Sequence, residues 1–186
     1  MTLKSIKEIE LQDSQILNIT YNNTGKFQEW EDLPDYCSVL VESKPSNSSS
    51  ILTEIWLPQD WNGIFVATGN GGLAGSIWHW SLAKYVKRGY AVCNTDMGTQ
   101  DGKKRGINNP EIWKDFGWRS TYLMTVVSKQ IITAYYGRKP TYSYFVGEST
   151  GGQQALTMAQ RFPKEYDGIV SGVPAYNRVR LHTAFV

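Results

Sequence analysis

A serine between two glycines is the residue whose setting points most directly to chemistry. Gly147, Ser149 and Gly151 have the spacing Gly-x-Ser-x-Gly, in which a sharp turn between a strand and a helix presents the serine hydroxyl. The glycines have a steric role, because strand and helix must approach each other closely on either side of the serine. The spacing predicts acyl transfer, in which Ser149 attacks a carbonyl carbon and forms an acyl-enzyme.

The residues around Ser149 fit that role. Residues 142–146 have the composition of a strand, and residues 153–162 follow a helical pattern. With 17 glycines in 186 residues, chance gives about 0.1 matches to the motif, so a glycine-rich turn without catalysis is the alternative. The strand before the serine and the helix after it favour a nucleophile.

An acyl-transfer serine also needs N–H donors for the negative charge that develops on the carbonyl oxygen. One donor is expected to be the backbone N–H of Thr150, at the start of the helix after the nucleophile. The second is expected in a glycine-rich loop after an earlier strand, where Gly71 and Gly72 are both candidates and Asn70 is a candidate pocket residue. A tight turn without this role is the alternative for the loop.

The general base and its acid partner are harder to place. In the order typical of this motif, both follow the serine, where little of the chain is left. A lone histidine at the position of His79 or His182 is more often structural than catalytic, and His182 qualifies only if the chain end folds back over Ser149. Asp96 ends a strand on the catalytic edge and is expected to shape the pocket, whereas Asp167 precedes a strand and belongs at the opposite end of the sheet.

Strand and helix patterns alternate along most of the chain. Short connections between them predict a mostly parallel sheet with helices on both faces, and two opening strands without a helix between them predict an antiparallel start. This is the layout of an incomplete α/β-hydrolase, without the lid and the C-terminal strands. We expect an N-terminal arm at 1–32, with a strand at 16–21, and the N-terminal part of the hydrolase domain at 33–186. The expected strands are 37–42, 51–57, 63–68, 90–94, 141–146 and 168–172, and the expected helices are 77–87, 121–136 and 150–162.

Composition excludes several function classes. The hydrophobic share is 41%, the charged share 19% and the net charge +2, too small for a nucleic-acid-binding face. The basic run 103–105 is interpreted as a solvated loop, and no Cys/His spacing indicates a metal site, so we expect no metal and no cofactor. Charges interrupt the first 30 residues, which predicts neither signal peptide nor membrane helix. The protein is expected to be cytoplasmic, or secreted with its leader removed.

A series of stretches occurs in a fixed order along the chain: 33–39, 55–63, 68–75, 88–91, 95–96, 143–151, 159–163 and 166–170. Together they resemble the tannase/feruloyl esterase family of α/β-hydrolases, and the resemblance covers about residues 33–186. It implies a serine carboxylic ester hydrolase that acts on small aromatic acid esters, such as feruloyl or galloyl esters, with Ser149 as the nucleophile.

The chain departs from the family pattern in two ways. Many members carry a cysteine just before the serine, disulfide-bonded to one beside the catalytic histidine, whereas Glu148 stands here. Cys37 and Cys93 either pair with each other or are free thiols. Members are also considerably longer: they continue into a lid domain and then return with the Asp and the His, which no residue here matches. Residues 173–186 resemble the approach to that lid.

Two hypotheses follow. In the first, the chain is the N-terminal portion of such an esterase and is nearly inactive alone. In the second, it is a truncated, non-catalytic module that binds a ligand or a partner. Both predict association, with a C-terminal half or as a homo-oligomer, because the strand at 168–173 would leave the sheet with an apolar edge.

Overall fold

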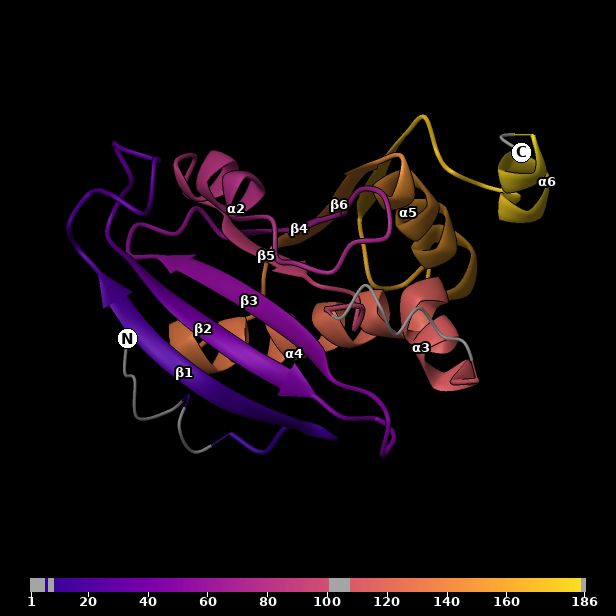
Figure 1. The fold of residues 1–186 in the computed structure, drawn as a ribbon. Helices are drawn as coiled ribbons and strands as arrows, with labels where there is room; N and C mark the ends of the chain where they lie inside the picture. Colours follow the sequence, from indigo (N-terminus) through magenta and orange to yellow (C-terminus); the bar gives the residue numbers. More distant parts are fainter. Residues whose placement is uncertain (1–5, 7–8, 101–107, 185–186) are drawn as a thin grey trace.

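A seven-stranded sheet with helices on both faces forms the molecule (Figure 1). The computed structural model describes residues 6, 9–100 and 108–184 of the 186. The elements are β1 (Ser14–Asn22), β2 (Tyr36–Ser43), β3 (Ile51–Pro58), β4 (Ile64–Thr68), α2 (His79–Val86), β5 (Ala91–Thr95), α3 (Pro110–Lys114), a π-helical turn η1 (Asp115–Arg119), α4 (Ser120–Tyr136), β6 (Tyr142–Glu148), α5 (Thr150–Arg161), β7 (Gly168–Gly172) and α6 (Arg178–Thr183). Every predicted strand and helix is present in the predicted order, and α3, η1 and α6 are additional elements that were not predicted.

The strand order is β1-β2-β3-β5-β4-β6-β7. Strands β4 to β7 pair in parallel where they are neighbours, and β1, β2, β3 and β5 pair antiparallel. The predicted parallel sheet with an antiparallel start is therefore present. Its antiparallel part is larger than expected, because the strand foreseen within the N-terminal arm pairs with β2 along its length and β3 runs opposite to β5.

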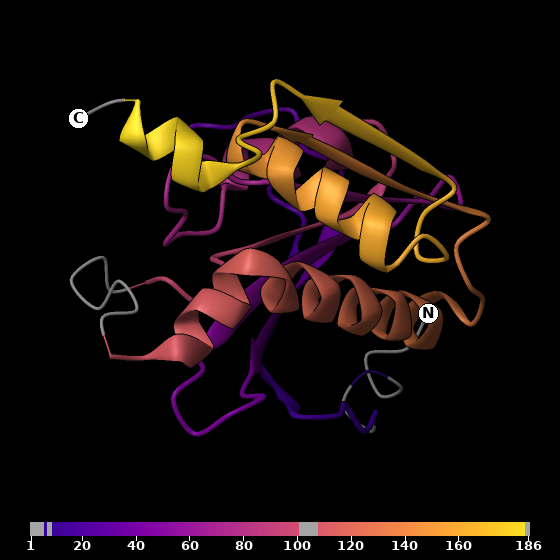
Figure 2. The same ribbon diagram turned by 90° about the vertical axis from the view of Figure 1, so that its right-hand side faces the viewer.

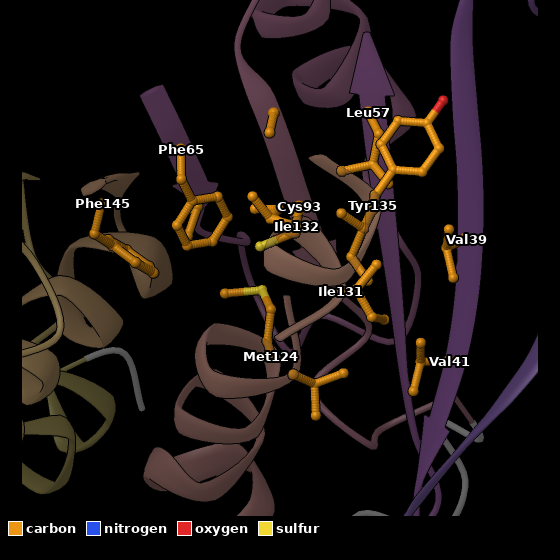
Figure 3. Packing of buried hydrophobic residues seen from close by; sticks show 14 of the residues in the cluster. Val39, Val41, Leu57, Phe65, Cys93, Met124, Ile131, Ile132, Tyr135 and Phe145 are labelled. Atoms are coloured by element: carbon orange, nitrogen blue, oxygen red, sulfur yellow. The ribbon is translucent and has the colours of Figure 1, made fainter. Parts of the chain in front are cut away.

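Alternate residues of β3 and of β5 enter two separate cores. In β3, Ile55 and Leu57 belong to a cluster with α4 and α5, whereas Trp56 between them belongs to a cluster with α2. Figure 2 shows α4 and α5 side by side over one face of the sheet, and Figure 3 shows the core beneath them. Burial on both faces explains why the central strands are continuously apolar rather than alternating.

Both cysteines are buried free thiols. Cys37 pairs with Leu57 and Cys93 pairs with Ile55, so strand β3 lies between them. Two strand spacings are about 10 Å, too far for a disulfide. Of the two alternatives foreseen, the structure thus has the free thiols. Burial raises the pKa of Cys37 to about 11 and that of Cys93 to about 12.

No helix of the described chain is long and apolar enough to cross a membrane. Among the same residues, no three His, Cys, Asp or Glu side chains come together in a group that could hold a metal ion.

Candidate active site

Ser149 lies at the junction of β6 and α5, as the motif predicts. Its backbone has φ +57° and ψ −116°, a conformation that is strained for a residue with a side chain. Three hydrogen bonds hold it there: its N–H donates to the Gly172 oxygen at 3.0 Å, and its carbonyl oxygen accepts from the N–H groups of Gln153 at 3.1 Å and Ala175 at 2.9 Å. Hydrogen bonds from α5, from the end of β7 and from the segment after β7 therefore hold the turn in place.

The glycines around Ser149 allow backbone segments to touch. A Cβ on Gly147 would lie 2.3 Å from the Gly151 oxygen, and one on Gly69 would lie 2.4 Å from the Gly151 Cα. A Cβ on Gly152 would lie 2.4 Å from the Gly172 oxygen. Real Cβ atoms do not approach so closely, so each of these positions requires glycine for β6, α5, β7 and the glycine loop to meet at one point.

The loop after β4 is bonded directly to the elbow. The Asn70 carbonyl oxygen accepts from the Gly151 N–H at 2.6 Å, and the Asn70 N–H donates to Gln154 Oε1 at 2.8 Å. Its side-chain amide donates to the Thr95 oxygen at 2.7 Å at the end of β5. Asn70 is 1% exposed, so its main contribution is to join the loop, α5 and β5.

The three predicted oxyanion donors lie at the start of α5 and in the glycine loop, and these two segments are hydrogen-bonded to each other. Thr150 Oγ1 donates to the Gly72 oxygen at 2.7 Å, which joins the first residue of α5 to the loop. The backbone N–H groups of Thr150, Gly71 and Gly72 have no hydrogen-bond acceptor within the described residues. Gly72 has φ +58°, a conformation that favours glycine. Unpaired N–H groups at a helix N-terminus can bind a developing negative charge.

A small cavity of about 110 Å³ lies beside the elbow on the α2 side. Its wall on α2 includes Trp80 and Lys84, and its floor includes Asn70 and Glu148. Trp78 also lines it and packs so closely on the loop that a Cβ on Gly71 would lie 2.4 Å from the indole. The cavity therefore combines a flat aromatic surface with one basic side chain, Lys84, and one acidic side chain, Glu148.

Arg178 is a site residue that the sequence analysis missed. Its guanidinium donates to Thr150 Oγ1 at 2.7 Å and to Gln153 Oε1, and lies 4.9 Å from the ring centroid of Phe116. Burial lowers the pKa of Arg178 below its usual value. No local motif indicates these contacts, because they form only when the segment after β7 folds back along α5.

Neither histidine is shown to act as the general base. His79 Nε2 is 2.8 Å from Glu54 Oε2, and its ring lies beside Phe27 and Trp56 over the antiparallel part of the sheet. This is the structural role expected of a lone histidine. His182 falls within α6, but its side chain lies outside the described residues.

The two aspartates lie at opposite ends of the sheet, as expected. Asp167 Oδ2 accepts from the Ser143 N–H at 2.8 Å, near the start of β6 and far along the strand from the elbow. Asp96 follows β5 and is 1% exposed; its Oδ1 accepts from the Leu52 N–H at 2.9 Å and the Gly98 N–H at 2.8 Å. Burial raises the pKa of Asp96. Its visible role is to hold the turn after β5.

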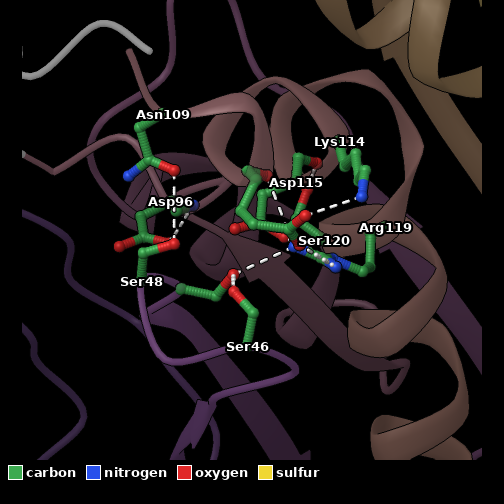
Figure 4. A network of polar contacts seen from close by, with 11 residues as sticks. Ser46, Ser48, Asp96, Asn109, Lys114, Asp115, Arg119 and Ser120 are labelled. Carbon is green, nitrogen blue, oxygen red and sulfur yellow. Dashed lines mark hydrogen bonds and ion pairs between the residues drawn. The ribbon is translucent and has the colours of Figure 1, made fainter. Parts of the chain in front are cut away.

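A polar network surrounds Arg119 in η1 (Figure 4). Arg119 donates to Asp115 Oδ1 at 2.6 Å, to Glu111 Oε2 at 2.7 Å and to Ser49 Oγ at 2.9 Å. These contacts join η1 and α3 to the turn between β2 and β3. The basic run 103–105 lies outside the described residues.

Comparison with known proteins agrees with this arrangement. The model of the tannase and feruloyl esterase family matches residues 37–186. The chain belongs to this family. As a member of the tannase and feruloyl esterase family, it is 41% identical over 142 residues to a probable feruloyl esterase B-2 of Aspergillus flavus and 40% identical over 148 residues to feruloyl esterase B of Aspergillus niger. These matches cover 76% and 79% of this chain, but 27% and 28% of the relatives.

Solved structures of the family have the same fold over nearly the whole chain. An esterase from Aspergillus oryzae superposes with a TM-score of 0.88 at 31% identity, covering 97% of this chain and 39% of that one. Feruloyl esterase B from the same organism gives 0.85 at 30% identity, with coverages of 96% and 38%. Tannin acyl hydrolase from Aspergillus niger gives 0.74 at 26% identity, with coverages of 94% and 37%. The chain thus spans well under half the length of the family members it matches.

Proposed function

We propose that this chain supplies the nucleophile and the oxyanion hole of a serine carboxylic ester hydrolase. The observation that supports this most strongly is the strained backbone of Ser149 beside unpaired N–H groups of Thr150, Gly71 and Gly72. A strained conformation held by several hydrogen bonds is typical of a functional residue. Family membership supports ester hydrolysis as the reaction.

The proposed reaction has two steps. Ser149 Oγ attacks the ester carbonyl carbon and loses its proton to a general base, while the carbonyl oxygen becomes an oxyanion that accepts from the Thr150 N–H and from Gly71 or Gly72. The alcohol leaves with a proton from that base, and the acyl group stays on Ser149. Water, activated by the same base, then releases the acid.

The general base is expected to come from further sequence. His79 is bonded to Glu54 away from the elbow, and the relatives are several times longer than this chain. We therefore expect the Asp and the His to lie on a segment that pairs with this one, either in the same polypeptide or in another. The substrate class suggested by the relatives' names is an ester of an aromatic acid, feruloyl or galloyl, bound beside Trp78 and Trp80.

The test is hydrolysis of p-nitrophenyl acetate, methyl ferulate and methyl gallate. We expect the whole polypeptide that contains residues 1–186 to hydrolyse these esters, and Ser149→Ala to abolish turnover. Loss of a serine nucleophile reduces kcat by about 10⁶-fold. Residues 1–186 alone should be nearly inactive. Efficient Ser149-dependent turnover by those residues alone would contradict the need for a further segment and would favour His182 as the base.

A non-catalytic binding module is the second candidate. It is favoured by β7, which pairs only with β6 among the described strands. Val170 in this edge strand is 59% exposed. Such an edge is normally covered. A fluorophosphonate probe separates the candidates: covalent labelling of Ser149 supports the esterase, and absence of labelling even with a C-terminal half present supports a binding role. Both candidates predict association, so a monodisperse monomer in light scattering would contradict that expectation.

A further inference from the structure

Gln154 links three elements beneath the proposed oxyanion hole. It lies four residues after Thr150, on the same face of α5, and is 2% exposed. Its Oε1 accepts from the Asn70 N–H at 2.8 Å, and its Nε2 donates to Thr121 Oγ1 at 2.9 Å in α4. A buried amide with partners on both sides has one fixed orientation, because turning it over would face donor to donor at Asn70.

The contact with Gln154 completes the attachment of Asn70. The Asn70 carbonyl oxygen is already held by the Gly151 N–H at 2.6 Å. Because a peptide unit is planar, fixing that oxygen also fixes the direction of the Gly71 N–H in the same unit. Fixing the Asn70 N–H with Gln154 fixes the preceding unit as well. The Asn70 backbone that leads into the two candidate donor glycines is thus held on both sides by α5, while Asn94 Nδ2 donates to the preceding Gly69 oxygen at 3.3 Å.

Gln154 lies too deep to reach a substrate, so any effect on the reaction must pass through Asn70. We infer that Gln154 is a positioning residue for the oxyanion hole: it sets the glycine loop at a fixed place relative to Ser149. Both groups are then carried by one helix, since α5 begins directly after the nucleophile and also binds the loop. This inference rests on the proposed function, in which the loop donates to the oxyanion.

Three variants separate positioning from packing. Gln154→Met keeps the length of the side chain but removes the acceptor for the Asn70 N–H. Gln154→Glu keeps that acceptor and can also accept from the Thr121 hydroxyl. Thr121→Val removes the other hydrogen-bond partner of Gln154 and leaves the contact with Asn70 in place. It is therefore the matched control for the loss of one buried hydrogen bond of Gln154.

The readouts are kcat, KM and affinity for an aryl trifluoromethyl ketone, which forms a tetrahedral oxyanion on serine. In the encoded protein, we expect Gln154→Met to lower kcat by about 10-fold or more and to weaken inhibition similarly, with little change in KM, because a misplaced donor affects the transition state. Gln154→Glu should restore kcat. Thr121→Val should lower thermal stability and leave kcat within about twofold.

Several results would overturn the inference. These are an unchanged kcat in Gln154→Met, an effect on KM alone, a Gln154→Glu variant as impaired as Gln154→Met, or an equal loss of kcat in Thr121→Val. If Ser149→Ala retains the wild-type activity, the proposed function fails instead, because the reaction then does not use this site.

Amide hydrogen exchange tests the positioning of the loop without requiring turnover. We expect the peptide that contains Asn70 and Gly71 to exchange faster in Gln154→Met than in the unchanged protein, and at the original rate in Gln154→Glu. Unchanged exchange in Gln154→Met would show that the loop is held without Gln154, whatever the activity of the protein.

Discussion

The guanidinium of Arg178 donates to Thr150 Oγ1 at 2.7 Å and so ties α6 to the first residue after Ser149. Thr150 Oγ1 in turn donates to the Gly72 oxygen, so the three residues form one chain of hydrogen bonds across the site. The segment that follows β7 is thereby fastened to the helix that carries the elbow.

The first prediction concerns that fastening. We expect Arg178→Met to speed cleavage of residues 176–184 by thermolysin about fivefold, because losing hydrogen bonds from a partly exposed cation costs about 1 kcal/mol of local stability. Arg180→Met is the matched control, since Arg180 lies in the same helix and is exposed. Equal cleavage rates for the two variants would show that Arg178 does not hold the segment.

A second prediction concerns the glycines of the elbow. Gly147→Ala should lower the free energy of unfolding by more than about 3 kcal/mol or prevent folding, because its Cβ would lie 2.3 Å from a backbone oxygen that cannot move alone. Gly117→Ala is the control: it lies in η1 with open space around its Cβ. There we expect an unchanged or slightly higher stability in urea unfolding.

The third prediction uses the strain at Ser149. Glycine adopts positive φ without strain, so Ser149→Gly should be more stable than Ser149→Ala by about 1 kcal/mol in urea unfolding, although both variants lose the nucleophile. At Ser76, whose φ is not positive, the order of the corresponding variants should be reversed or equal. A Ser149→Ala variant at least as stable as Ser149→Gly would mean that the elbow stores no strain.

The fourth prediction concerns pH. Burial raises the pKa of Glu54, but hydrogen bonds from His79, Trp56 and Ser38 outweigh it, and the pKa is lowered from 4.5. Because the pKa of Glu54 is lower in the folded state, its carboxylate stabilises the folded protein at any pH above the pKa of an unfolded glutamate, about 4.3. This stabilisation is lost as the pH falls through the folded-state pKa. Glu54→Gln should therefore destabilise at pH 7 by about 1 kcal/mol or more, with a smaller difference near pH 3.

Urea unfolding at the two pH values tests this expectation. Glu29→Gln, at an exposed position, serves as the control and should change stability by less than about 0.5 kcal/mol at either pH. A difference between Glu54→Gln and the unchanged protein that is the same at pH 7 and pH 3 would mean that the carboxylate contributes through packing alone.

The elbow could be predicted from the sequence because its causes are local. Gly147 is required by its contact with Gly151, four residues further on, and the strand and helix that flank Ser149 have their own patterns. The glycine loop was predictable from its place in the order of elements, directly after a strand, although its contacts with Gly151 and Gln154 join distant parts of the chain. Arg178 and Gln154 were not, because each acts through a partner that packing brings from another part of the chain.

The length of the antiparallel part was also hidden, for a different reason. Ile16 and Ile19 both pack against the larger core, although a spacing of three in a regular strand would place them on opposite faces. A register shift between Ile16 and Asn18 brings them to the same face. The bulge breaks the alternation by which a strand is recognised, so only a short strand at 16–21 within an arm was predicted where β1 covers Ser14–Asn22.

The strand order described above also has a consequence for the time at which the reactive serine is formed. Strands β1, β2 and β3 pair with their neighbours in sequence, whereas the elbow needs β4, β6 and β7, which are joined by long crossovers. Contacts close in sequence form first, so during synthesis we expect a three-stranded ladder before Ser149 is even made. Ser149 is then placed in its turn last, so under the proposed function a partly folded chain does not present the nucleophile to passing esters.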